Sequence, residues 1–129
     1  MLLDTHALIW LLTDDRRLGS TAREAVLNPA NEVFVSIVSL WEMAVKIRIG
    51  KLTAVDLDEV FRAVIEHGLN LLSLELPHLS EMLRLPRHAE HRDPFDHQLV
   101  AQALVENLIF VTNDHNARRY DVQLLGCSE

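Results

Sequence analysis

The chain has 129 residues, of which 49% are hydrophobic and 24% are charged, and its formal net charge at pH 7 is −7. This length and composition predict a single soluble globular domain over residues 1–129. The negative charge excludes a histone-like nucleic-acid binder, which needs clustered lysine and arginine. It does not exclude an enzyme whose carboxylates hold metal cations.

Membrane and secretory segments are not evident in the sequence. The longest apolar stretch, residues 33–41, is far too short to span a bilayer, and no basic segment precedes a hydrophobic one. The lone Cys127 excludes an internal disulfide and fits a reducing compartment. We therefore expect a cytoplasmic protein that makes no membrane contact.

Apolar patterns and turn residues predict strands that alternate with helices. In chain order they predict a strand at 1–4, helices at 5–12 and 20–28, a strand at 32–37, helices at 39–50 and 56–68, a strand at 69–74, helices at 77–85 and 93–107, and strands at 108–112 and 122–125. The strands are almost continuously apolar, which favours a parallel sheet buried on both faces. The predicted fold is therefore α/β, with a mainly parallel sheet of four to five strands between two layers of helices.

Acidic residues follow the predicted strands. Asp4 follows the first strand, Glu42 lies early in the helix after the second, and Asp114 follows the fourth, while Asp93 and Asp96 open the helix that leads to it. Ligands of parallel α/β sheets bind outside the carboxyl ends of the strands. We therefore expect these five acids to gather at one edge of the sheet.

Most of these acids also have a local explanation. Ser39 and Glu42 fit a capping box, and Asp93 fits an N-cap with Asp96 in the first turn, where acids favour the helix dipole. Asp114 fits an Asx-turn. Helix N-termini aimed at the cluster would soften its repulsion, so capping is compatible with a site.

Asp4 is the hardest of the acids to explain locally, although it is placed to cap the helix that follows it. A strand as short and apolar as residues 1–3 belongs at the centre of a sheet, where an unpartnered carboxylate is costly. A cluster of such acids raises its own pKa values unless a cation intervenes. Oxygen ligands without His or Cys at ligand spacing suit Mg²⁺ or Mn²⁺ rather than Zn²⁺.

The histidine and tryptophan side chains give no further indication of a binding site. None of the seven histidines forms a helical zinc pair, so we expect them to be solvated or hydrogen-bonded. Trp10 and Trp41 have apolar neighbours, and we expect both in the core.

Four segments resemble the PIN-domain nucleases, and most closely the VapC-like toxins of type II toxin–antitoxin systems. They are LLDTHALIWLL, VSLWEMAVKIRIGKL, HRDPFDHQLVAQA and FVTND, and the resemblance covers nearly the whole chain. It implies a PIN-like three-layer fold. It also implies a catalytic, metal-binding quartet with a fifth ligand, leaving open which acid of the DPFD segment is the main ligand. The quartet is Asp4, Glu42, Asp96 and Asp114, and the fifth ligand is Asp93.

The activity implied by this resemblance is Mg²⁺- or Mn²⁺-dependent hydrolysis of RNA of the tRNA or rRNA class. The metal activates a water for in-line attack, leaving 5′-phosphate and 3′-hydroxyl ends. Thr5 and Thr112 then line the site. Arg92 and Arg118, near the acids in sequence, are candidate substrate contacts, as is His97, which replaces the arginine usual after DPFD in this branch.

Partners follow from the same resemblance: a cognate antitoxin held in a groove within residues 39–69, and a second copy in a homodimer. Two alternatives remain. A metal-dependent phosphohydrolase of small phosphoesters is less favoured because the chain lacks a DxD opening and a glycine-rich phosphate loop. A non-catalytic interaction module gains little, because acids occupy all four quartet positions.

Overall fold

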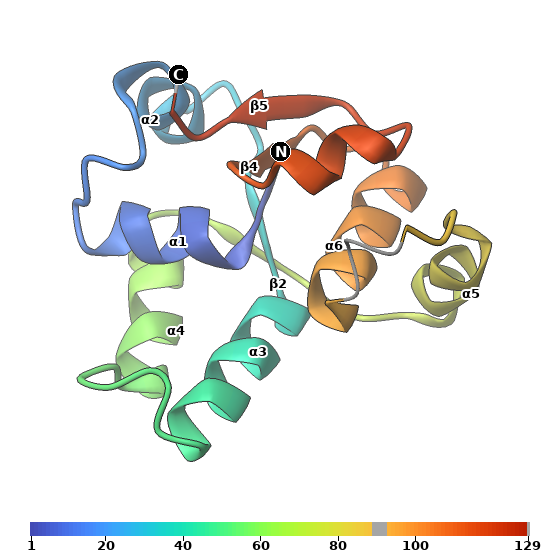
Figure 1. Cartoon of the computed structure of the whole chain (residues 1–129). Coiled ribbons are helices and arrows are strands. Elements are labelled where there is room, and N and C mark those ends of the chain that lie inside the picture. The colour runs from blue at the N-terminus through green and yellow to red at the C-terminus, as the bar shows by residue number, and fades with distance from the viewer. Residues whose placement is uncertain (89–92, 129) are drawn as a thin grey trace.

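A computed structural model of the chain describes residues 1–88 and 93–128 (Figure 1). The strands are β1 (Leu2–Leu3), β2 (Phe34–Ser36), β3 (Asn70–Leu72), β4 (Phe110–Thr112) and β5 (Leu124–Gly126). The α-helices are α1 (Thr5–Leu12), α2 (Ser20–Leu27), α3 (Ile37–Arg48), α4 (Leu57–Glu66), α5 (Leu76–Arg84) and α6 (Pro94–Val105). A short 3₁₀ helix, η1, covers His115–Arg119.

The strands form one sheet in the order β3-β2-β1-β4-β5, and every neighbouring pair is parallel. Strand β1 is central, because Leu2 pairs with Phe34 on one side and with Phe110 on the other. The predicted α/β class and parallel sheet are confirmed. The carboxyl ends of β2, β1 and β4 therefore lie next to one another, and each leads into a segment that carries an acid.

Alternate residues of the central strands enter two different cores. Leu2 and Phe110 pack with α6 on one face of the sheet, and Leu3, Val35 and Val111 pack with α1, α2 and α4 on the other. Helix α5 packs against α6 (Figure 1). A sheet with a hydrophobic core on each face and helices outside both is the three-layer arrangement that the sequence predicts.

Helix α3 begins two residues earlier than predicted. Its N-cap is Ser36, whose Oγ accepts a hydrogen bond from the Val38 N–H (3.0 Å) and donates one to Gln102 Oε1 (2.5 Å). The capping box proposed for Ser39 and Glu42 is therefore wrong. Local sequence misses this start because β-branched residues follow Ser36 and because Gln102 is remote in the chain.

A buried polar network joins α5 to α6. His78 is 1% exposed; its Nδ1 accepts a hydrogen bond from the Glu75 N–H (3.0 Å), and its Nε2 lies 2.8 Å from Glu106 Oε2. The Gln98 side chain donates to the His78 carbonyl oxygen (2.8 Å). Buried polar groups are tolerated when they are satisfied in this way, and such networks fix how two helices pack.

The two tryptophans differ in burial. Trp10 is 8% exposed, as predicted, but Trp41 is 56% exposed, so its assignment to the core is wrong. The inward positions of α3 are taken by Leu40 and Met43, which leaves Trp41 on the outer side of the helix. No helix within the described ranges is both long enough and apolar enough to span a bilayer.

Candidate metal centre

Asp4 lies at the carboxyl end of β1 and is 6% exposed. It is the N-cap of α1: its Oδ1 accepts from the Ala7 N–H (2.7 Å), and its Oδ2 accepts from the Thr112 hydroxyl (2.6 Å). Burial raises the pKa of Asp4, although these two hydrogen bonds oppose the shift. The carboxylate is thus held in a fixed orientation at a position that disfavours its charge.

Thr112, the last residue of β4, joins two of the predicted acids. Its hydroxyl donates to Asp4 and accepts a hydrogen bond from the Asp114 N–H (3.0 Å). Asp114 in turn caps η1, because its Oδ1 accepts from the Asn116 N–H (2.9 Å). Asp114 is therefore an Asx-turn residue, as the sequence suggests, and also a neighbour of Asp4.

Glu42 approaches the same edge from α3 and is 2% exposed. Its Oε1 accepts a hydrogen bond from the Thr5 hydroxyl (2.7 Å), and Thr5 also hydrogen-bonds the Ser39 hydroxyl (3.0 Å). Its Oε2 contacts Lys46 Nζ at 2.5 Å. Glu42 therefore does not cap its own helix; it faces α1 and makes a salt bridge.

Asp93 and Asp96 approach from the start of α6. Asp93 is the predicted N-cap, accepting from the Phe95 N–H (2.8 Å) and the Asp96 N–H (3.3 Å). Burial, which is the largest cause, and the negative charges of the other four acids together raise the pKa of Asp96 to about 8. Those four are Asp93, Glu42, Asp114 and Asp4. All five predicted acids thus lie within electrostatic reach of one carboxyl group.

A cavity of about 340 Å³ opens among these acids. Its acidic lining is Asp4, Asp96 and Asp114, and its remaining lining residues are His6, Trp10, Arg17 and Asn113. The Arg17 guanidinium lies 5.1 Å from the Trp10 ring centroid and is held there by Asp15 (2.7 Å).

His6, Trp10 and Arg17 form a wall that the sequence reasoning missed. A signal was available, because His6 and Trp10 are four residues apart on the helix that Asp4 caps and so share one face.

The predicted substrate contacts have different surroundings. Arg118 is exposed and lines a second cavity of about 150 Å³ together with Thr112 and Asp114. The His97 ring packs edge-on against Tyr120, with centroids 6.3 Å apart. Arg92 lies outside the described residues.

The donor set suits a hard divalent cation. Its side chains offer carboxylate oxygens, and a cation would relieve the repulsion that, together with burial, raises the pKa of Asp96. Within the described ranges, however, no three acidic, histidine or cysteine side chains already converge as ligands of one ion. Both oxygens of Glu42 are engaged, by Thr5 and by Lys46. A cation that binds Oε2 would therefore lie close to the Lys46 ammonium group.

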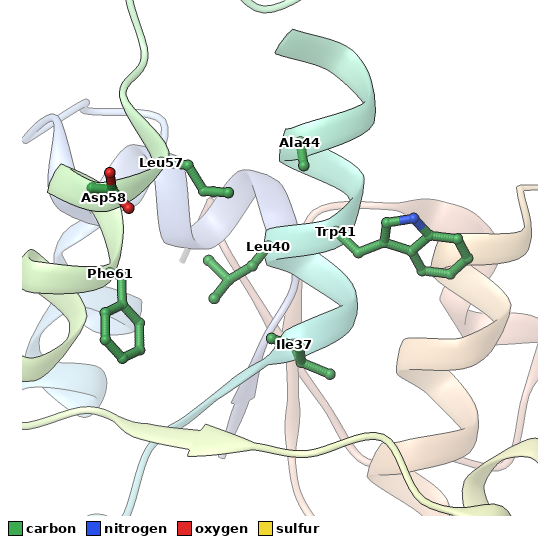
Figure 2. A pocket seen from close by; sticks show the side chains of 7 residues that line it. All are labelled: Ile37, Leu40, Trp41, Ala44, Leu57, Asp58 and Phe61. Atoms are coloured by element: carbon green, nitrogen blue, oxygen red, sulfur yellow. The ribbon is translucent and has the colours of Figure 1, made fainter. Parts of the chain in front are cut away.

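A separate apolar groove of about 330 Å³ lies between α3 and α4. Figure 2 shows Leu40, Leu57 and Phe61 around it, whereas the Trp41 ring points toward α6. There it meets Phe95 edge-on, with ring centroids 4.9 Å apart. Phe61 is 42% exposed, so the groove leaves a large apolar side chain in contact with solvent.

Several proteins of known structure have the same fold. A chain of VapBC2 from Rickettsia felis, solved bound to a DNA fragment from its promoter, superposes with a TM-score of 0.73 at 15% identity, covering 97% of this chain and 96% of that one. A chain of a toxin–antitoxin complex from Klebsiella pneumoniae gives 0.68 at 17% identity, covering 99% and 98%. FitAcB from Neisseria gonorrhoeae gives 0.66 at 17% identity, covering 98% and 96%.

These identities are low, and the likeness is one of fold. No curated protein matches the chain in sequence. The model of the PIN domain matches residues 1–123, which include all five acids. The chain therefore belongs to the PIN-domain family, whose members are generally nucleases.

Proposed function

We propose that the chain is a Mg²⁺- or Mn²⁺-dependent endoribonuclease and the toxin of a type II toxin–antitoxin pair. The observation that carries this proposal is the cavity lined by Asp4, Asp96 and Asp114, with Glu42 and Asp93 within electrostatic reach of Asp96. Acids delivered by several elements to one opening are expected of a cation site, and helix capping by three of them does not explain why they converge. The all-oxygen donor set favours Mg²⁺ or Mn²⁺ over Zn²⁺.

In this proposal Asp4, Glu42, Asp96 and Asp114 hold the metal, and Asp93 assists from the N-cap of α6. When bound, a divalent cation lowers the pKa of a water and stabilises negative charge on a phosphoryl oxygen. Asp96 holds a proton at neutral pH in the metal-free protein, because its pKa is about 8. A bound cation would favour the deprotonated form of Asp96, and the Thr112 hydroxyl orients Asp4.

RNA is the proposed substrate, of the tRNA or rRNA class. In the wall formed by His6, Trp10 and Arg17, the exposed His6 ring and Arg17 guanidinium are groups that contact bases and phosphates in single-stranded nucleic acid, and the buried Trp10 ring supports them from below. Arg118 offers a second cation beyond Asp114. Phosphate can thus approach the acids between positively charged neighbours.

The groove between α3 and α4 is the proposed seat of the antitoxin. It lies within residues 39–69 except for its first residue, Ile37, and it is almost wholly apolar. Apolar grooves of this kind accept the apolar face of an amphipathic helix. A homodimer, inferred from the family resemblance, and a cytoplasmic location, inferred from the lone cysteine and the sequence's lack of evident membrane and secretory segments, complete the proposal.

The test is cleavage of structured RNA by the purified chain with Mn²⁺ or Mg²⁺. We expect EDTA to stop cleavage and Asp4→Asn to abolish it, because asparagine keeps the cap on α1 but lacks the charge. Asp121→Asn, at an exposed position, is the matched control and should cleave normally. RNA cleavage by Asp4→Asn at the wild-type rate would refute the mechanism. Hydrolysis of a small phosphomonoester without RNA cleavage would identify a phosphohydrolase instead.

A further inference from the structure

Lys46 makes direct contact with one of the site acids. Its Nζ lies 2.5 Å from Glu42 Oε2, one helical turn along α3. Pairs with this spacing are common on exposed helix faces, where they contribute only a few tenths of a kcal/mol. This pair differs, because the Glu42 side chain is 3% exposed and that of Lys46 is 35% exposed. A carboxylate so deeply buried requires a counter-charge, and Lys46 supplies it.

The charge of Lys46 also reaches acids on another helix. Burial alone lowers the pKa of Lys46, but the contact with Glu42 and the charges of Asp93 and Asp96 more than reverse this effect, so the pKa is raised. Lysine is an ammonium ion at neutral pH in any case, and the salt bridge to Glu42 places this charge beside the acidic cluster. It occupies the Glu42 side of the acidic cluster, where a divalent cation would otherwise find an available oxygen.

We propose that Lys46 is the resident counter-ion of the Glu42 side of the site and competes with a divalent cation for Glu42. The inference rests on the proposed function, since it takes the acids to be the metal site. In the metal-free protein Lys46 offsets the repulsion among the acids, and it leaves Glu42 Oε2 when the metal binds. Glu42 remains anchored meanwhile, because the Thr5 hydroxyl holds Oε1 independently.

The direction in which metal affinity changes when Lys46 is removed distinguishes two roles for this lysine. A lysine that merely positions Glu42 strengthens metal binding, so its removal weakens the affinity. A lysine that competes with the metal weakens binding, so its removal tightens the affinity. Losing one partly solvated ion pair corresponds to about two- to fivefold in Kd. General damage to the site cannot imitate this result, because damage also weakens binding.

The experiment is calorimetric titration of the full chain with Mn²⁺. We expect Lys46→Met to bind Mn²⁺ about two- to fivefold more tightly than wild type. In EDTA the same variant should unfold at lower urea, since Glu42 is left buried without a counter-charge. Lys46→Gln removes the charge but keeps a hydrogen-bond donor for Glu42. It should therefore tighten Mn²⁺ binding similarly and should be more stable in urea than Lys46→Met. Lys51→Met removes an exposed lysine nearby and should match wild type.

The remaining outcomes separate the two proposals. If wild type binds Mn²⁺ and both Lys46 variants bind it equally or more weakly, Lys46 does not compete with the metal for Glu42. The proposed metal site is then unaffected. If wild type binds no Mn²⁺, the proposed function is wrong and the competition model is wrong with it.

Discussion

Replacing Asp96 with asparagine should stabilise the metal-free protein. The pKa of Asp96 is about 8 in the folded chain, against an ordinary value of 3.8. The folded state therefore holds this proton more tightly than the unfolded state, and stability present below pH 4 is lost as the pH rises toward 8. At pH 7 the two pKa values correspond to a penalty on the order of 4 kcal/mol. Solvent reaches this half-buried side chain, so we expect Asp96→Asn to gain about 2–4 kcal/mol at pH 7.

Urea unfolding in EDTA at pH 4, 6 and 8 measures this effect. The advantage of Asp96→Asn should be below about 1 kcal/mol at pH 4 and should grow with pH. Exposed Asp121→Asn should show no such trend. With Mn²⁺ added, wild type should gain stability and the variant should gain much less, because ligand binding stabilises only the state that binds it. An advantage that is absent at pH 8, or that does not change with pH, would refute the reasoning.

Three further predictions concern other contacts. Thr112→Val removes the hydrogen bond to Asp4 and should destabilise the metal-free protein by about 2 kcal/mol in urea unfolding. Because the pKa of Asp4 then rises further, this loss of stability should shrink as the pH falls. Arg17→Gln should weaken RNA binding in fluorescence anisotropy and reduce the slope of log Kd against log salt by about 1, whereas Arg16→Gln should leave both unchanged; an unaltered slope would exclude a phosphate contact at position 17. His78→Phe loses hydrogen bonds at both ring nitrogens and should cost about 2–4 kcal/mol in urea unfolding; wild-type stability would show the network to be dispensable.

The fold could be predicted from the sequence because the patterns that specify it are local and repeated. Alternating apolar strands and helices specify a parallel sheet, and Asp93 ahead of Pro94 specifies the start of α6. The start of α3 was not accessible, because Ser36 is selected as N-cap partly through Gln102, which lies 66 residues away. The exposure of Trp41 was missed for a related reason. Apolar neighbours along the chain do not reveal which side of a helix the rest of the protein covers.

The gathering of the five acids was predictable from their positions after the strands, but their hydrogen-bond partners were not. The sequence shows Asp4 and Thr112 at opposite ends of the chain, and only the pairing of β1 with β4 brings them to hydrogen-bond distance. Lys46 illustrates the same limit. Its four-residue spacing from Glu42 is visible, but the burial that distinguishes the pair from an ordinary surface salt bridge depends on α1 and α6.

Three of the acids, Asp4, Asp93 and Asp114, also hold the first turn of a helix. Asparagine caps helices as well as aspartate does, and the codons of the two residues differ by a single base. One point mutation can therefore remove a charge from the cluster while the helix beneath it keeps its first turn. Substitution of one such aspartate by asparagine is thus a short evolutionary route to a chain that folds normally but has a less acidic cluster.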